Sequence, residues 1–184
     1  MINPILKATI IGGLIIFIWG MISWMVLPWH EKTLHSFKDE TAVARTITDN
    51  ATVSGIYFLP SMESAAKTSP QQSSVPQLFA AVKLDGMSKS MIQPMIISLI
   101  TQFIIVSLAA WLLMQTCKLS YFHRFVFLIV FAVAASIMTN IPYWNWFGFS
   151  MDYTLVMIAD SLVGWILAGL VIAKLVPGKT GYQP

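Results

Sequence analysis

Four long apolar runs constrain this chain more than any other feature of its sequence. They cover residues 6–27, 91–117, 121–142 and 153–175. Each is long enough for a membrane crossing, because a helix needs about 20 apolar residues to span the hydrocarbon core of a bilayer. Hydrophobic residues make up 57% of the 184 residues and charged residues only 10%, whereas soluble domains are roughly 25% charged. The sequence therefore predicts an all-α integral membrane protein with four transmembrane helices.

The basic residues predict the orientation of these helices. Lys7, Lys118, Arg124 and Lys174 flank the apolar runs at ends that share one side in a four-helix protein, and no acid accompanies them there. Since cytoplasmic loops carry an excess of Lys and Arg, we expect a bacterial-type inner-membrane protein with both termini in the cytoplasm. The net charge of +3 then reflects topology, and no nucleic-acid partner is expected.

The expected organisation follows from these runs. The first run is longer than the roughly 7 to 15 residues of a secretory signal and lacks a small-residue cleavage site, so it is interpreted as an uncleaved signal anchor. The predicted segments are the N-terminus with the first helix (1–29), an extracytoplasmic insertion (30–90), the second helix (91–117), a cytoplasmic turn (118–124) that overlaps the third helix (121–142), an outer aromatic turn (143–152), the fourth helix (153–175) and a cytoplasmic tail (176–184).

The insertion is predicted to be a small α/β unit. Apolar residues recur at helical spacing over 31–50, which favours an amphipathic helix. Residues 53–59 and 77–84 are rich in β-branched, aromatic and apolar residues and could pair as a two-stranded ribbon, while the polar stretch 61–76 is typical of a mobile linker. Because an isolated ribbon is marginally stable, we expect it to rest on the helix, on the membrane surface or on another protein.

Asp160 is the most informative single residue, because it lies inside the fourth run. An ionisable group at that depth costs about 2.5 to 3.5 kcal/mol and usually faces a bundle interior. Desolvation without a nearby Lys or Arg favours the protonated acid, which can donate a hydrogen bond to Gln102 or Thr101. The neutral residues at the same depth are Thr101 and Gln102 on the second helix, Ser136 on the third, and Ser23 or Trp19 on the first.

Small residues accompany Asp160 along the fourth helix. Gly164 and Ala168 follow it at four-residue spacing, and Gly169 and Ala173 repeat that spacing. Such residues let membrane helices approach closely. We therefore expect a buried polar contact that locks the fourth helix against the second. The alternative is a proton- or solute-coupled site at Asp160, although a relay normally needs several titratable groups.

Aromatic residues gather at the expected outer boundary of the membrane. Tyr143, Trp144, Trp146 and Phe147 lie in the predicted outer turn, and Trp29 follows the first helix. Such rings anchor helices at headgroup level. They could also contact lipid or dock another subunit, because exposed aromatic patches often mark contact surfaces.

A soft-metal site is a further hypothesis for the outer side. Met87, Met91 and Met95 recur at four-residue spacing, and His30 and His35 lie nearby in the expected topology. Thioethers favour Cu(I), but methionine also fills irregular packing. The two histidines are five residues apart, which does not match the H-E-x-x-H zinc motif.

No phosphate-binding loop, Ser/His/Asp order or CxxC motif is present in the sequence. We therefore expect neither an enzyme nor a cofactor. The favoured interpretation is an accessory or interaction subunit that contacts lipid or a larger membrane complex, either with other membrane-protein subunits or as a homo-oligomer. A transporter or channel subunit that uses Asp160, and copper handling, are the alternatives.

Overall fold

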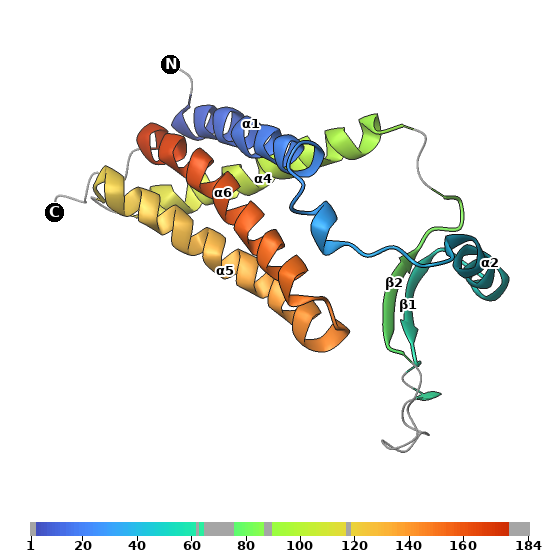
Figure 1. Ribbon diagram of the computed structural model, residues 1–184. Coiled ribbons are helices and arrows are strands. Elements are labelled where there is room, and N and C mark those ends of the chain that lie inside the picture. The colour runs from blue at the N-terminus through green and yellow to red at the C-terminus, as the bar shows by residue number, and fades with distance from the viewer. Residues whose placement is uncertain (1–2, 62, 65–75, 87–89, 117–118, 177–184) are drawn as a thin grey trace.

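The computed structural model describes residues 3–61, 63–64, 76–86, 90–116 and 119–176. Within these residues, four long helices pack side by side, and the insertion projects from one end of the bundle (Figure 1). All four are long and apolar enough to cross a membrane. A short helix and a two-stranded sheet complete the described fold. The predicted class, four apolar helices with a small α/β insertion, is confirmed at this level.

The four long helices start close to the predicted positions. Polar caps explain three of the starts, since Asn3, Ser120 and Ser150 each accept a hydrogen bond from a main-chain N–H of the first turn. The helices are α1 (Pro4–Met25), α4 (Ile92–Gln115), α5 (Tyr121–Phe147) and α6 (Met151–Leu175).

The end of α5 differs from the prediction. The helix was expected to stop at Pro142, but it continues to Phe147 and ends at Gly148, whose φ of 74° closes the helix. A proline removes only its own N–H from the helical ladder, and apolar spanning helices tolerate it where other groups satisfy the freed carbonyl. The predicted aromatic turn therefore begins as the last turns of α5.

The insertion contains the predicted ribbon and a shorter helix than expected. Strands β1 (Gly55–Leu59) and β2 (Leu78–Val82) are antiparallel, with Gly55 opposite Val82. Helix α2 (Glu40–Asn50) begins where the Asp39 side chain accepts a hydrogen bond from the Ala42 N–H, so the expected helix over 31–50 is replaced at its start by a 3₁₀ turn, Glu31–Thr33. Most of the predicted mobile linker, residues 62 and 65–75, lies outside the described residues.

The helices pack in an order that the sequence did not predict. Helix α1 lies between α4 and α6, and α6 lies between α1 and α5, while α4 and α5 barely touch. Glycine explains the central place of α1, because a Cβ on Gly12 would lie 2.8 Å from Ile172 of α6 and 3.0 Å from Val106 of α4. The expected packing of the fourth helix against the second is thus replaced by packing of α6 on α1 and α5.

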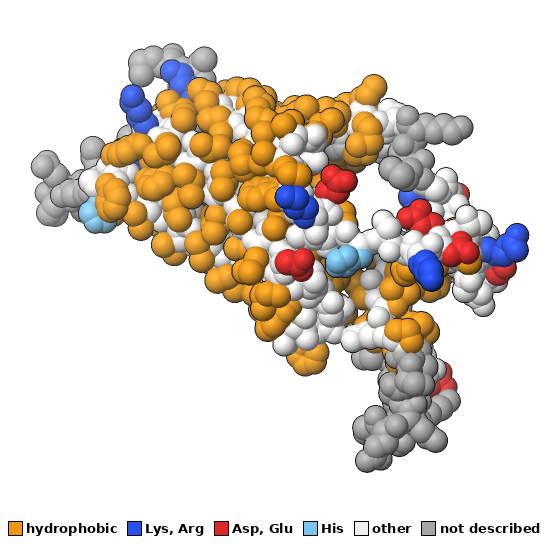
Figure 2. Space-filling model, viewed as in Figure 1, with side chains coloured by type: hydrophobic (Ala, Val, Ile, Leu, Met, Phe, Trp, Pro, Cys, Tyr) orange, Lys and Arg blue, Asp and Glu red, His pale blue; other side chains and the backbone are white. Residues whose placement is uncertain are grey.

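The buried core fills the half of the bundle that is remote from the insertion. Most of it lies near the start of α1 and α5 and the end of α4 and α6: Ala8, Val106, Ala109, Ala110, Leu113, Leu128, Ala132, Trp165, Ala168, Ile172, Ala173 and Val176. Hydrophobic side chains cover the visible bundle surface, whereas charged side chains gather over the insertion and the bundle ends (Figure 2). The insertion end of the bundle holds fewer of these buried residues.

Candidate functional site

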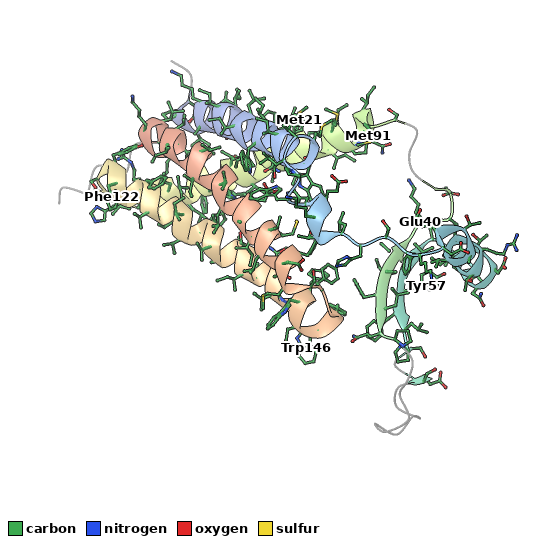
Figure 3. All side chains as sticks on the ribbon, in the orientation of Figure 1. Met21, Glu40, Tyr57, Met91, Phe122 and Trp146 are labelled. Atoms are coloured by element: carbon green, nitrogen blue, oxygen red, sulfur yellow. The ribbon has the colours of Figure 1, made fainter. Side chains whose placement is uncertain are left out.

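The main feature of the insertion end is a cavity of about 740 Å³ among the four long helices. It lies where α4 separates from α5, so the open seam of the bundle and the cavity coincide. Most of its wall is apolar, with Met21 on α1 and Met91, just before α4, near its insertion end (Figure 3). The polar part of the wall consists of Ser98, Gln102, Ser136, Thr139, Asn140, Asp160 and Ser161.

Asp160 on α6 lines this cavity and contacts α1 directly. The indole Nε1 of Trp19 donates to Asp160 Oδ1 at 2.7 Å and to the main-chain oxygen of the same residue at 3.0 Å. An indole N–H can only donate, so Oδ1 must accept. Gly164 makes room for this contact, because a Cβ at that position would lie 3.1 Å from Trp19 Cδ1.

The second partner of Asp160 comes from the start of the insertion. His30 is 2% exposed, and its Nε2 lies 3.4 Å from Asp160 Oδ2 and 3.0 Å from Ser23 Oγ. Trp24 stacks on the imidazole with ring centroids 3.9 Å apart. The Trp29 indole donates to Ser23 Oγ at 2.9 Å. The chain that leaves α1 therefore folds back over Ser23 and Asp160.

The other nitrogen of His30 restricts where the protons lie. Nδ1 is buried and has no hydrogen-bond partner among the described residues. Within this part of the chain, Nδ1 lacks a partner in either tautomer, and a charged ring would bury an unpaired charged donor there, which costs more than a neutral group. The two neutral tautomers differ at Nε2: a proton on Nε2 can be donated toward Ser23 Oγ and Asp160 Oδ2, whereas a lone pair on Nε2 would face the carboxylate. Neutral imidazole and an accepting carboxylate therefore fit this geometry best.

Thr101 and Ser136, which were expected near Asp160, make hydrogen bonds to other residues. Thr101 donates to the Ile97 carbonyl of its own helix, and Ser136 donates to Ser161 Oγ at 3.0 Å. Gln102 and Ser136 do line the same cavity as Asp160. Depth along the helices correctly placed Trp19 and Ser23 at the level of Asp160, but it could not show that α1 rather than α4 lies beside α6.

The small residues of α6 divide between two neighbours. Gly164 lies against Trp19 of α1, whereas a Cβ on Gly169 would meet Phe125 of α5 at 3.4 Å. Ala168 and Ala173 are fully buried in the core. The predicted small-residue face therefore serves close packing, on α1 and α5.

The predicted metal ligands are only partly brought together. Met91 and Met95 line the cavity with Met21, Met25 and Met157, while His35 is exposed. His30 is engaged by Ser23 and Asp160, and Met87 lies outside the described residues. Within the described ranges, no group of three or more His, Cys, Asp or Glu side chains could hold a metal ion. Soft-metal binding stays a prediction of the sequence.

The predicted aromatic cluster contacts the ribbon. Phe79 of β2 lies 4.4 Å from Phe147 and 6.2 Å from Tyr143, measured between ring centroids. Trp146 at the end of α5 is 72% exposed, and its carbonyl accepts a bond from Gln77 Nε2 at 3.4 Å (Figure 3). Trp144 is also exposed, whereas Trp29 donates to Ser23 beside His30 and Asp160. The ribbon thus rests on the end of α5.

Comparison of the chain with protein-family models, with curated proteins and with solved structures finds no match.

Proposed function

We propose that this chain is a non-enzymatic, multi-pass protein of a bacterial-type inner membrane that binds a membrane-resident amphiphile in the cavity between α4 and α5. Both termini lie in the cytoplasm in this proposal, and the insertion lies on the opposite side. The observation that carries the proposal is the open seam: α4 and α5 barely touch, although the other neighbouring helices are closely packed.

The chemistry of the wall supports an amphiphilic occupant. Apolar residues such as Phe17, Ile105 and Phe131 provide a surface for hydrocarbon, and polar side chains from α4, α5 and α6 face the same space. The cavity volume of about 740 Å³ falls within the roughly 300 to 1,000 Å³ of small-molecule sites. A molecule that enters from the bilayer could therefore bury its apolar part and hydrogen-bond its polar part.

A helix of a partner protein could fill the same seam, as the accessory-subunit interpretation expects. The polar wall argues for the amphiphile, because membrane helix pairs pack mainly through small and apolar side chains. Asp160, Gln102 and Asn140 instead offer several hydrogen-bonding groups to one compact ligand. Transport through Asp160 would require such binding first, so it stays a further prediction about the same cavity.

Photocrosslinking tests the proposal directly. The protein would be reconstituted in vesicles of bacterial phospholipids that contain a photoactivatable, alkyne-tagged neutral amphiphile, and labelled peptides would be mapped by mass spectrometry. We expect labels on the cavity-facing residues of α4 and α5, such as Ser98 and Thr139. Labels confined to lipid-facing residues outside the cavity, or a partner helix crosslinked in the seam of protein from native membranes, would refute amphiphile binding there.

Two cavity-filling variants sharpen the test. Both Gly20 and Ala135 line the cavity, and a Cβ on Gly20 meets nothing within 4 Å, so Gly20→Leu and Ala135→Leu should each fill part of the cavity. The matched control is Ala134→Leu, since Ala134 is the exposed neighbour on α5 and does not line the cavity. Labelling should fall severalfold in the two cavity variants and stay unchanged in the control.

A further inference from the structure

The charge of the cavity wall suggests which occupant it selects. Of the residues that line the cavity within the described part of the chain, Asp160 alone has an ionisable side chain. No Lys, Arg or His is on that wall to offset it. A like charge placed opposite another costs several kcal/mol where water is excluded, so an anionic occupant would be disfavoured beside an Asp160 carboxylate.

The neighbours of Asp160 hold it as an acceptor. Trp19 Nε1 donates to Oδ1, and the neutral His30 tautomer with its proton on Nε2 directs that proton toward Ser23 and Oδ2. These two N–H groups stabilise negative charge without cancelling it. A carboxylate has about four lone-pair positions, so acceptor capacity is left for a group in the cavity.

The rest of the wall suits a weakly hydrated cation. Trp19, Trp24 and Trp165 line the cavity together with five methionines, and one ring face of Trp24 is covered by His30. Indole faces attract cations, by about 2 kcal/mol where water is excluded. A strongly hydrated metal cation gains little from such a wall, whereas an organic cation with apolar substituents can contact both the rings and Asp160.

The depth of Asp160 separates a lipid headgroup from a free amphiphilic cation. Asp160 follows the first residue of α6 by nine positions, which places it about 13 Å along the helix at 1.5 Å per residue. A phospholipid headgroup would have to leave the interface to reach that level. A compact lipophilic cation that partitions into the bilayer can reach it directly.

We infer that the cavity selects lipophilic organic cations of the quaternary ammonium or phosphonium class, with the positive centre opposite Asp160. The inference rests on the proposed amphiphile binding and adds the charge and the class of the ligand. It assigns Asp160 a selecting role, with Trp19 and His30 as residues that position its carboxylate.

Two ions of the same size provide the test. Tetraphenylphosphonium and tetraphenylborate differ mainly in the sign of their charge, and each would be titrated against the purified full-length chain in lipid nanodiscs. Each ion is compared between the wild type and Asp160→Asn. The different partitioning of the two ions into lipid is the same in both samples and therefore does not affect the comparison. We expect Asp160→Asn to weaken tetraphenylphosphonium binding roughly tenfold or more and to leave tetraphenylborate binding unchanged or stronger.

The control variant is Asp152→Asn, because Asp152 is the exposed acid on the same helix and does not line the cavity. It should bind both ions as the wild type does. If Asp160→Asn binds tetraphenylphosphonium as tightly as the wild type, or if Asp152→Asn weakens binding equally, selection by Asp160 is refuted.

A competition experiment keeps the inference testable if Asp160→Asn does not fold. In the wild type, tetraphenylphosphonium should displace the photoactivatable neutral amphiphile from cavity peptides, and tetraphenylborate should not. Equal displacement by both ions, or displacement only by phosphatidylethanolamine, refutes selection of lipophilic cations but leaves amphiphile binding intact. Absence of cavity labelling before any competitor is added refutes the proposed function itself.

Discussion

His30 ties the insertion to the helical bundle through contacts on several sides of its ring. Trp24 stacks on one face, Trp29 meets the ring edge-on with centroids 5.5 Å apart, and Nε2 reaches Ser23 and Asp160. Its main-chain carbonyl also accepts a bond from Thr33 Oγ1 at 2.8 Å. His30 follows the first apolar run directly, and it is one of the most buried polar side chains among the described residues.

Replacement of His30 should therefore destabilise the protein. His30→Ala removes the contacts to Asp160 and Ser23 and uncovers Trp24, so we expect the free energy of unfolding to fall by about 2 kcal/mol. Thermal unfolding in a mild detergent, followed by tryptophan fluorescence, measures the change. His35→Ala is the matched control because His35 is exposed; equal losses in both variants would contradict the role given to His30.

Among the elements, α1 packs closely against both α4 and α6. Gly12 and Gly13 are buried, and added side chains there would collide with Ile172 of α6 and Phe103 of α4. The same helix carries Gly20, which faces open space. The glycines of α1 thus have two roles, close packing at Gly12 and Gly13 and the lining of an unfilled cavity at Gly20.

The two kinds of glycine predict opposite outcomes for one substitution. Gly12→Leu should lower the free energy of unfolding by about 3 kcal/mol, because overpacking forces α1 away from its neighbours. Gly20→Leu should leave it nearly unchanged or raise it slightly. Denaturation of both variants in mixed micelles gives the comparison, and a similar loss in both would show that α1 is not wedged between α4 and α6.

The ribbon predicts a second pair of variants at the scale of elements. Phe79 contacts Phe58, Tyr143, Phe147 and Phe149, so Phe79→Ala should release β1 and β2 from the end of α5. Hydrogen exchange of the two strands should then accelerate at least tenfold, since an isolated ribbon is marginally stable.

The control for the ribbon is Ile56→Ala, because Ile56 is 64% exposed. It removes an apolar side chain from the same ribbon and leaves the cluster with α5 intact. Strand exchange in this variant should match the wild type, and faster exchange in both variants would mean that the ribbon is held by something other than Phe79.

The sequence predicted the elements better than their neighbours. Apolar runs decide where long helices form, so all four were found, and the β-branched, aromatic and apolar residues of 53–59 and 77–84 were enough to locate the ribbon. Packing order depends on which helix carries closely fitting glycines, and Gly12 gives no sign of its neighbours before the structure is known. His30 was missed as a partner of Asp160 because the chain reverses after Met25, and no local pattern indicates that reversal.

For the whole molecule, the described start of α1 and the described end of α6 lie at the end of the bundle opposite the insertion (Figure 1). This arrangement agrees with an even number of crossings and with the distribution of Lys and Arg. It leaves the α4–α5 seam as the one loosely packed side among these four helices. In the proposed membrane arrangement, the seam between α4 and α5 would face the lipid.

Cysteine labelling tests the orientation. After Cys117 is replaced by Ser, Thr48→Cys on exposed α2 should react with a membrane-impermeant maleimide added outside intact spheroplasts. A cysteine introduced at Lys7 should react only after lysis, because that end is expected in the cytoplasm. The reverse pattern would invert the proposed orientation, and reaction at both sites in intact cells would contradict a spanning arrangement.

The contact between Asp160 and Trp19 also bears on how the protein is made. Trp19 and His30 are synthesised long before Asp160, which lies in α6, the last of the four long helices. If the four helices span a membrane as proposed, the indole N–H and the imidazole precede the carboxylate in the bilayer, and neither side has its partner until α6 is present. Joining α6 to α1 satisfies both sides at once, so we expect a product that stops before α6 to leave Trp19 and His30 without these partners.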